Sequence, residues 1–236
     1  MARRRVNTTK HEIIQVAMAL FLEVGVTQTS PKMIAEKLEL STGNITYYFP
    51  TKEHLLAVLV DMLCDFRKAQ MERQTAAGIP PIVRLCMEYA AMITLCSEQS
   101  NASDVYRSAY ASDLCLELIQ RHKAERARRI FAPYHPEWTA EQYARAAVMV
   151  SGIDQTSLRI NDFVPSVKER ISVGLDAILS IYGVPAEERR ELIAKVTAID
   201  CSAVAQKEFQ AFTEYVAHIT EETLDDLFNQ MRYRYD

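Results

Sequence analysis

The sequence predicts an all-α protein with a small N-terminal three-helix domain and a larger C-terminal helical bundle. Apolar residues recur at helical spacing along most of the 236 residues, and only six glycines interrupt them. No strand-like alternation of useful length is present. A chain of this length with 49% hydrophobic residues can bury a substantial core. We place the domains at residues 1–54 and 55–236.

The first predicted helix runs from Thr9 to about Val24. Thr9 followed by Glu12 has capping-box spacing, and Gly25 is a natural helix stop. An apolar stripe at helical spacing gives this helix one face that can pack on the next two: Ile13, Ile14, Ala17, Leu20 and Phe21.

The sequence of residues 30–52 predicts two short helices joined by a four-residue turn. Ser30 can cap the first helix, with Pro31 at the first helical position, where a missing N–H costs nothing. Ser41 is the N-cap candidate of the second helix, residues 42–49. Two short helices on a longer amphipathic one are the layout of a helix-turn-helix DNA reader.

Ile45 and Phe49, four residues apart, can anchor the second short helix to the first predicted helix. The other side chains at its N-terminal end then face outward, where small hydrogen-bonding groups suit a DNA groove and its phosphates. Asn44 can pair with adenine through two hydrogen bonds, and Lys52 can contact a phosphate. The predicted DNA-binding residues are Ser30, Lys32, Thr42, Gly43, Asn44, Thr46, Tyr47, Tyr48 and Lys52.

At these residues the chain resembles the tetracycline-repressor (TetR) family of bacterial transcription regulators. The resemblance covers about the first sixty residues and departs from the family pattern at two positions. Glu39 stands where the turn usually has Gly, and Thr46 stands where the recognition helix usually has Tyr. The matching positions are Ala17, Phe21, Gly25, Ile34, Ala35, Ser41, Gly43, Tyr48, Phe49, Lys52, Glu53, Leu55 and Leu56.

The charge is divided between the two predicted domains. The net charge is −4, yet residues 1–56 carry seven Lys/Arg against five Asp/Glu, a net of +2, which leaves −6 for the remainder. Positive charge confined to one end suits a protein that meets phosphates only there. Arg3, Arg4, Arg5 and Lys10 predict either a basic arm that follows the DNA or a solvated terminus without a specific contact.

The remaining helices are predicted from caps and breakers. Thr51 opens a long helix that ends near Ala76, and Pro80 and Pro81 open the next helix, which ends near Cys96. Ser97–Asp104 is predicted as a loop, and 104–131 as helical with a possible break. Thr139 with Gln142, and Ser166 with Glu169, have capping-box spacing. These caps open helices over 139–163 and 166–183, and residues 186–198 and 202–232 are predicted to form at least two more.

The resemblance implies a homodimer that binds an inverted-repeat operator, most often as a repressor, and that a small molecule releases. One helix-turn-helix covers about one half-site, which also favours a dimer. The predicted dimer helices are 139–163 and 166–182, where Ala146, Ala147, Ser151 and Gly152 would allow close contact. These small residues equally suit the core of one monomer.

The resemblance also implies an effector pocket in the bundle. Met and aromatic residues of the middle helices are candidates, although such stripes also form ordinary cores. Asp154 and Arg159, polar within an apolar run, would need partners if buried, and a solvated or interface role is the alternative. The candidates are Met62, Phe66, Met87, Tyr89, Met92, Tyr106, Tyr110, Asp154 and Arg159.

Other functional classes have less support in the sequence. No phosphate loop, GxSxG, HExxH or paired ligand spacing is present, so we expect no enzyme, no metal and no cofactor. Five scattered cysteines and the absence of a long apolar run indicate a cytoplasmic protein without a membrane span. An all-helical enzyme, a cysteine redox switch and a bundle that docks another protein remain alternatives.

Overall fold

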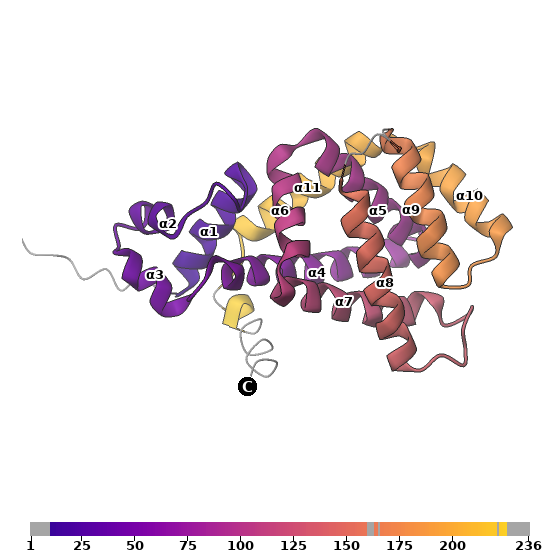
Figure 1. Cartoon of the computed structure of the whole chain (residues 1–236), viewed down its shortest axis with the longest axis horizontal. Coiled ribbons are helices and arrows are strands. Elements are labelled where there is room, and N and C mark those ends of the chain that lie inside the picture. Colours follow the sequence, from indigo (N-terminus) through magenta and orange to yellow (C-terminus); the bar gives the residue numbers. More distant parts are fainter. Residues whose placement is uncertain (1–9, 160–162, 165, 221, 226–236) are drawn as a thin grey trace, which may run out of the picture.

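The chain folds into α-helices only, within the residues that this computed structural model describes: 10–159, 163–164, 166–220 and 222–225. The predicted all-α class is therefore confirmed. A small N-terminal group of helices lies at one end of an elongated molecule, and the bundle forms the rest (Figure 1). The predicted basic arm with Arg3, Arg4 and Arg5 lies outside the described residues.

Three helices form the N-terminal end: α1 (Lys10–Val24), α2 (Pro31–Lys37) and α3 (Thr42–Tyr48). Ser30 caps α2 as predicted, because its hydroxyl accepts a hydrogen bond from the Met33 amide at 3.2 Å. Ile13, Ile34 and Ile45, one from each helix, are at most 1% exposed and belong to one core. That shared core holds the short α3, which could not be stable alone.

The turn from α2 to α3 contains a strained residue. Glu39 has a φ of 55°, in the left-handed region that favours glycine. The Leu40 amide donates to the Ala35 carbonyl at 2.9 Å, and the Glu39 amide donates to the Glu36 carbonyl at 3.3 Å. These two bonds are the Schellman pattern that satisfies the last carbonyls of a helix. The backbone therefore keeps the geometry of a glycine turn although the residue is glutamate.

A long helix, α4 (Lys52–Ala76), leads from the N-terminal end through the bundle (Figure 1). The boundary that we predicted after residue 54 falls in its first turn, and one continuous core reaches from Ile13 in α1 to Phe66 in α4. The other bundle helices are α5 (Pro81–Glu98), α6 (Ser100–Ala111), α7 (Asp113–Phe131), α8 (Ala140–Ser157), α9 (Val167–Ile181), α10 (Ala186–Thr197) and α11 (Cys201–Ala217).

Two predicted boundaries were wrong. The segment predicted as a loop, Ser97–Asp104, is helical except at Gln99, and its second half opens α6. Burial of Ala102 and Val105 stabilises this helix despite its polar sequence. The helix predicted to reach Phe163 ends at Ser157, where the Arg170 guanidinium donates to the Ser157 carbonyl at 3.2 Å. A cation bonded to the last carbonyls is a favourable helix end.

The C-terminal helix α11 returns along the bundle and packs against α1, α4 and α5 (Figure 1). Phe212 and Val216 of this helix are buried in the same core as α1 and α4. The C-terminal part of the chain thus reinforces the junction between the two ends of the molecule. None of the described helices is long and apolar enough to span a membrane.

Candidate nucleic-acid interface and ligand cavity

The outer face of α3 presents polar, uncharged side chains. Thr42, Gly43, Asn44 and Thr46 are exposed, and Tyr47 is 81% exposed. Only Ile45 of this helix is buried, so the predicted division between anchoring and outward residues is present. Phe49, the second predicted anchor, is 4% exposed. The arrangement offers hydrogen-bonding groups to a groove while the helix rests on its apolar side.

Two side chains of α3 have local partners that the sequence analysis did not predict. Ser41 was expected to cap α3, but its hydroxyl makes no capping bond and donates instead to Asn44 Oδ1 at 2.5 Å. That bond orients the Asn44 amide and leaves its N–H donors exposed. The Thr46 hydroxyl donates back to the Gly43 carbonyl at 3.3 Å, which ties it to its own helix.

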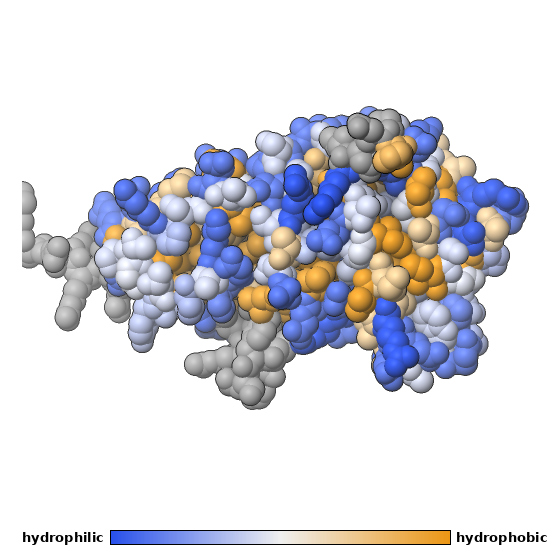
Figure 2. All heavy atoms as spheres, in the orientation of Figure 1, coloured by the Kyte–Doolittle hydropathy of each residue, from blue (hydrophilic) through white to orange (hydrophobic). Residues whose placement is uncertain are grey.

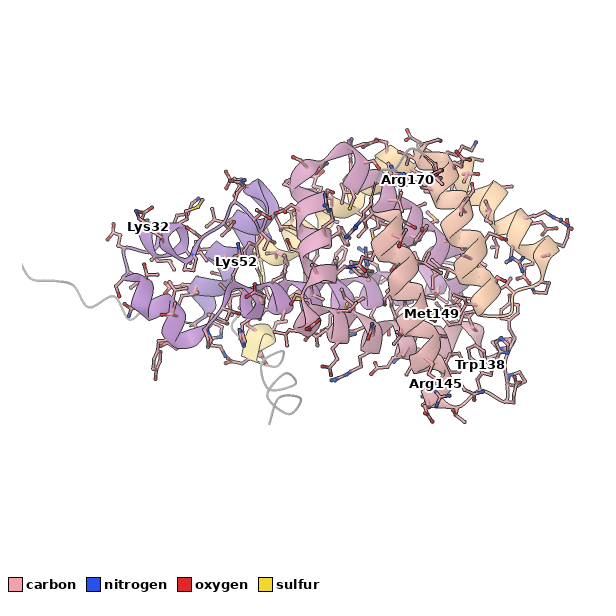
Figure 3. All side chains as sticks on the ribbon, viewed as in Figure 1. Lys32, Lys52, Trp138, Arg145, Met149 and Arg170 are labelled. Atoms are coloured by element: carbon pink, nitrogen blue, oxygen red, sulfur yellow. The ribbon has the colours of Figure 1, made fainter. Side chains whose placement is uncertain are left out.

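The two predicted lysines have different surroundings. Lys32 is exposed on α2 at the outer end of the molecule, and its ammonium lies 3.8 Å from the Glu36 carboxylate (Figure 3). Lys52, at the start of α4, donates to the Val26 carbonyl at 2.6 Å and to the Thr29 carbonyl at 3.0 Å. Lys52 therefore binds the loop between α1 and α2, a structural role that we did not predict. Its phosphate contact stays a prediction.

The same α1–α2 loop is also held by α6. Asp104 accepts hydrogen bonds from the Thr27 amide at 2.7 Å and from the Thr27 hydroxyl at 2.5 Å. The Asn101 amide donates to the Leu22 carbonyl at 2.5 Å. Gly25 has a φ of 90°, and a Cβ there would lie 2.7 Å from Asp104 Oδ2, so a side chain would disturb this contact. Helix α6 thus binds the N-terminal end directly.

A cavity of about 560 Å³, here called the main cavity, lies beside α6. Its walls come mainly from α4, α6, α7 and α11, with Leu22 of α1 and Pro81 of α5, and most of its lining is apolar. Of the predicted effector residues, Tyr106 and Tyr110 line it. The volume is within the range of about 300–1,000 Å³ that is usual for small-molecule sites.

The other predicted effector residues lie elsewhere. Phe66, Tyr89, Met92 and Asp154 line two smaller cavities of about 40 and 30 Å³. Met62 is fully buried in the core, and Met87 packs against the bundle core without lining any of the three cavities. Arg159 is exposed, because α8 ends before it. These three candidates therefore do not line the main cavity.

Asp154 is buried with partners. Its Oδ2 accepts a hydrogen bond from the Tyr110 hydroxyl at 2.6 Å and one from the Lys123 ammonium. Burial, followed by the charge of Asp154, raises the pKa of Tyr110 well above its usual value, so this hydroxyl stays protonated as a donor. Asp154 Oδ1 has no hydrogen-bond partner among the described residues. The partners of Asp154 come from α6 and α7, too distant in sequence to be predicted.

Buried charges form a second network in the bundle. Glu88 of α5 accepts from Arg84 at 3.1 Å and from Arg126 at 2.5 Å, and Arg84 also pairs with Glu208 of α11. Arg84 is 1% exposed and Glu88 is 3% exposed. Each charge has an opposite charge in contact, as burial requires. None of these four residues was a predicted candidate.

The predicted dimer face is only partly on the surface. Ala146, Ala147 and Ser151 are buried inside the bundle, as their alternative interpretation required, whereas Gly152 is exposed. Three other residues of α8 and α9 are exposed and apolar: Val148 at 50%, Met149 at 64% and Val173 at 57%. Figure 2 shows apolar surface over these two helices, and Figure 3 shows where Met149 lies on α8. These three residues form an apolar patch on the outer surface of α8 and α9.

The described residues give little support to a metal site or a cysteine redox switch. No group of three or more His, Cys, Asp or Glu there is arranged to hold a metal ion. Burial raises the pKa of Cys64 to about 12, which keeps this cavity-lining thiol protonated and poorly reactive. His135 stacks on Trp138 with ring centroids 3.9 Å apart, a packing contact.

The sequence is similar to those of known bacterial transcription regulators. Residues 13–59 match the family model described as bacterial regulatory proteins, tetR family. The HTH-type transcriptional regulator HbdR from Aromatoleum sp. (strain CIB) is 32% identical over 104 residues, which are 44% of this chain and 45% of that protein. The match thus spans less than half of that relative's length.

Solved structures of RolR share the fold over most of the chain. RolR in complex with resorcinol superposes with a TM-score of 0.61 at 20% identity, covering 77% of this chain and 91% of RolR. RolR without ligand gives a TM-score of 0.58 at 19% identity, covering 78% and 95%. The shared fold includes the helical bundle, beyond residues 13–59 that match the family model.

Proposed function

Because this chain belongs to the tetR family of bacterial regulatory proteins, we propose that it represses transcription as a ligand-released homodimer on an inverted-repeat operator. It is a DNA-binding regulator of the helix-turn-helix type. In this proposal it is not an enzyme and requires no cofactor. The release step is supported by one observation: α6 both lines the main cavity and binds the α1–α2 loop.

The proposed DNA contact is made by α3, with Asn44 as the base reader. Its exposed amide and the neighbouring Thr42 and Tyr47 can enter a major groove. One such helix reads about one half-site, so specific binding requires two copies with a fixed spacing. The apolar patch on α8 and α9 supports this pairing, since exposed apolar residues on neighbouring helices favour association.

Ligand release follows from the position of α6. A molecule in the main cavity contacts the side of α6 that carries Tyr106 and Tyr110, two turns or less from Asp104. A shift of α6 would be transmitted to Thr27 and so to the N-terminal helices. By linkage, a ligand that weakens DNA binding by some factor is itself weakened by DNA by the same factor. The main cavity favours this model over a solid bundle that docks only a protein.

The proposal is tested by selecting bound sequences from a random double-stranded DNA pool with the purified full chain. We expect an inverted repeat, bound by two copies, with an affinity that falls as salt rises. Weak, salt-sensitive binding without any enriched sequence would contradict it. Screening compounds against the enriched operator then tests release.

The dimer is tested separately by sedimentation. Replacing Met149 with Glu places a charge in the apolar patch and should shift the protein toward monomer. Ile199→Glu, at a 37% exposed residue outside α8 and α9, is the matched control and should leave the oligomeric state unchanged. A monomeric native protein, or equal behaviour of the two variants, would argue against this face.

A further inference from the structure

The main cavity combines an apolar body with a concentration of cations. Its apolar walls come mainly from α4, α6, α7 and α11 and include Leu63, Met71, Ile119 and Phe209. Five permanent cations also line it, against two carboxylates, Glu72 and Glu125. The five cations are Arg67, Lys68, Lys123, Arg126 and Arg129.

Most of these cations have a protein counterion or lie in solvent. Lys123 pairs with Asp154, Arg126 pairs with Glu88, and Arg129 lies 3.9 Å from Glu72. Lys68 and Glu125 are exposed. Arg67 is the exception, since no carboxylate of the described residues lies within 4.0 Å of its guanidinium.

Arg67 lines each of the three cavities. The Arg67 guanidinium donates a hydrogen bond to the neutral Tyr106 hydroxyl at 2.7 Å, although a guanidinium has five N–H donors. Glu88 and Glu208 act on it at longer range, but both are bonded to Arg84. A half-buried cation with unused donors beside an apolar cavity favours an anionic ligand.

Tyr106 completes the site for an acid group. Burial raises the pKa of Tyr106 to about 12, so its hydroxyl stays protonated at neutral pH. That hydroxyl accepts from Arg67, which leaves its own proton for a ligand oxygen. One carboxylate can therefore accept hydrogen bonds from both side chains while the rest of the ligand contacts the apolar walls.

We propose that the main cavity binds an amphipathic organic carboxylate: an apolar ring system or chain whose acid group is held by Arg67 and Tyr106. This inference rests on the proposed function only in calling the ligand an effector, since binding itself requires no DNA. It names the chemical class that the cavity prefers over neutral molecules of the same shape.

The test compares two probes of nearly equal size, 2-naphthoate and its neutral amide, 2-naphthamide, by isothermal titration calorimetry with the purified full chain. We expect the carboxylate to bind with one site per chain and at least tenfold more tightly than the amide. The fluorescent anion 8-anilinonaphthalene-1-sulfonate should be displaced by the carboxylate. Equal affinity of acid and amide, or binding of none of the three probes, would overturn the proposal.

Two variants assign the preference to Arg67. Arg67→Gln should remove the tenfold preference and leave amide binding within about twofold, whereas Arg67→Lys, which keeps the charge, should retain part of it. Arg121→Gln, on the exposed face of α7 and outside the cavity, is the matched control and should change neither affinity. A preference that survives Arg67→Gln in a normally folded protein would also overturn it.

The two proposals fail in different ways. An enriched operator that is released only by neutral compounds would refute the carboxylate and leave the regulator intact. Carboxylate binding that depends on Arg67, without any enriched DNA sequence, would refute the regulator and leave the ligand class standing.

Discussion

The N-terminal end and the bundle place their polar side chains in opposite ways. Around α3 the polar groups are uncharged and exposed, and they rest on an apolar core formed by α1, α2 and α3. In the bundle, Arg84, Glu88 and Asp154 are charged and almost fully buried. Exposed groups are available to a partner, whereas buried charges must be satisfied inside the protein. The difference predicts where substitutions affect recognition and where they affect folding.

The largest effect is expected in the bundle, from Glu88→Gln. The change leaves Arg126 without its carboxylate and Arg84 with only Glu208, and breaking a buried pair typically costs about 3–5 kcal/mol. Urea unfolding at one fixed protein concentration measures it. Glu117→Gln, which breaks the exposed pair with Arg121, should cost less than about 1 kcal/mol. Similar losses in both variants would contradict the contrast between the two environments.

The same contrast explains how much the sequence could predict. The DNA reader is contained in about forty consecutive residues whose caps and apolar spacing are local. The sequence therefore predicted the cap at Ser30, the burial of Ile45 and the position of the turn at Glu39. The cavity is formed mainly by α4, α6, α7 and α11, and no local signal in the sequence identifies Arg67 as one of its lining cations. Periodicity gives the buried face of a helix but not the helix that packs on it, so the sequence could not show that Met62 and Met87 lie outside the main cavity.

At the outer end, Asn44→Ala should change recognition without changing folding. Asn44 is exposed, and its bond from Ser41 holds the amide in one orientation. We expect a loss of about 1–3 kcal/mol on the selected operator and a relaxed preference at one base pair. Binding to a panel of single-base operator variants measures both. A uniform loss across the panel would make Asn44 a backbone contact.

Lys52 combines a structural role with a predicted DNA contact, so its replacement should affect both stability and DNA binding. Its bonds to the Val26 and Thr29 carbonyls predict that Lys52→Met destabilises the protein by about 1–2 kcal/mol, since hydrogen bonds of charged groups contribute at this level. If Lys52 also meets a phosphate, the salt slope of DNA binding should fall by about 1. Lys32→Met, at an exposed lysine, is the control for stability and should leave it unchanged. An unchanged unfolding midpoint for Lys52→Met would remove the structural role.

Asp104 connects the bundle to the N-terminal end. Its loss should therefore weaken the coupling between ligand binding and DNA binding more than it weakens either binding step alone. Asp104→Ala removes both bonds to Thr27. We expect the ligand's effect on operator affinity to fall by about 1 kcal/mol, or fivefold, with ligand affinity in the absence of DNA nearly unchanged. Arg107→Ala, at an exposed position of the same helix, should leave the coupling intact. Full coupling without Asp104 would mean that α6 acts through other contacts.

The smallest effect concerns Glu39, where the N-terminal end keeps a strained residue. A left-handed residue with a side chain costs about 1–2 kcal/mol, and glycine relieves this at the expense of about 0.4–1 kcal/mol of extra unfolded-chain entropy. Glu39→Gly should therefore stabilise the protein slightly, by about 0.5 kcal/mol in urea unfolding. Glu39→Gln removes the same charge but keeps the strain, so it separates electrostatics from backbone conformation. If Gln stabilises as much as Gly, the cost at this turn is the negative charge near α3, and the same variant should then tighten DNA binding at low salt.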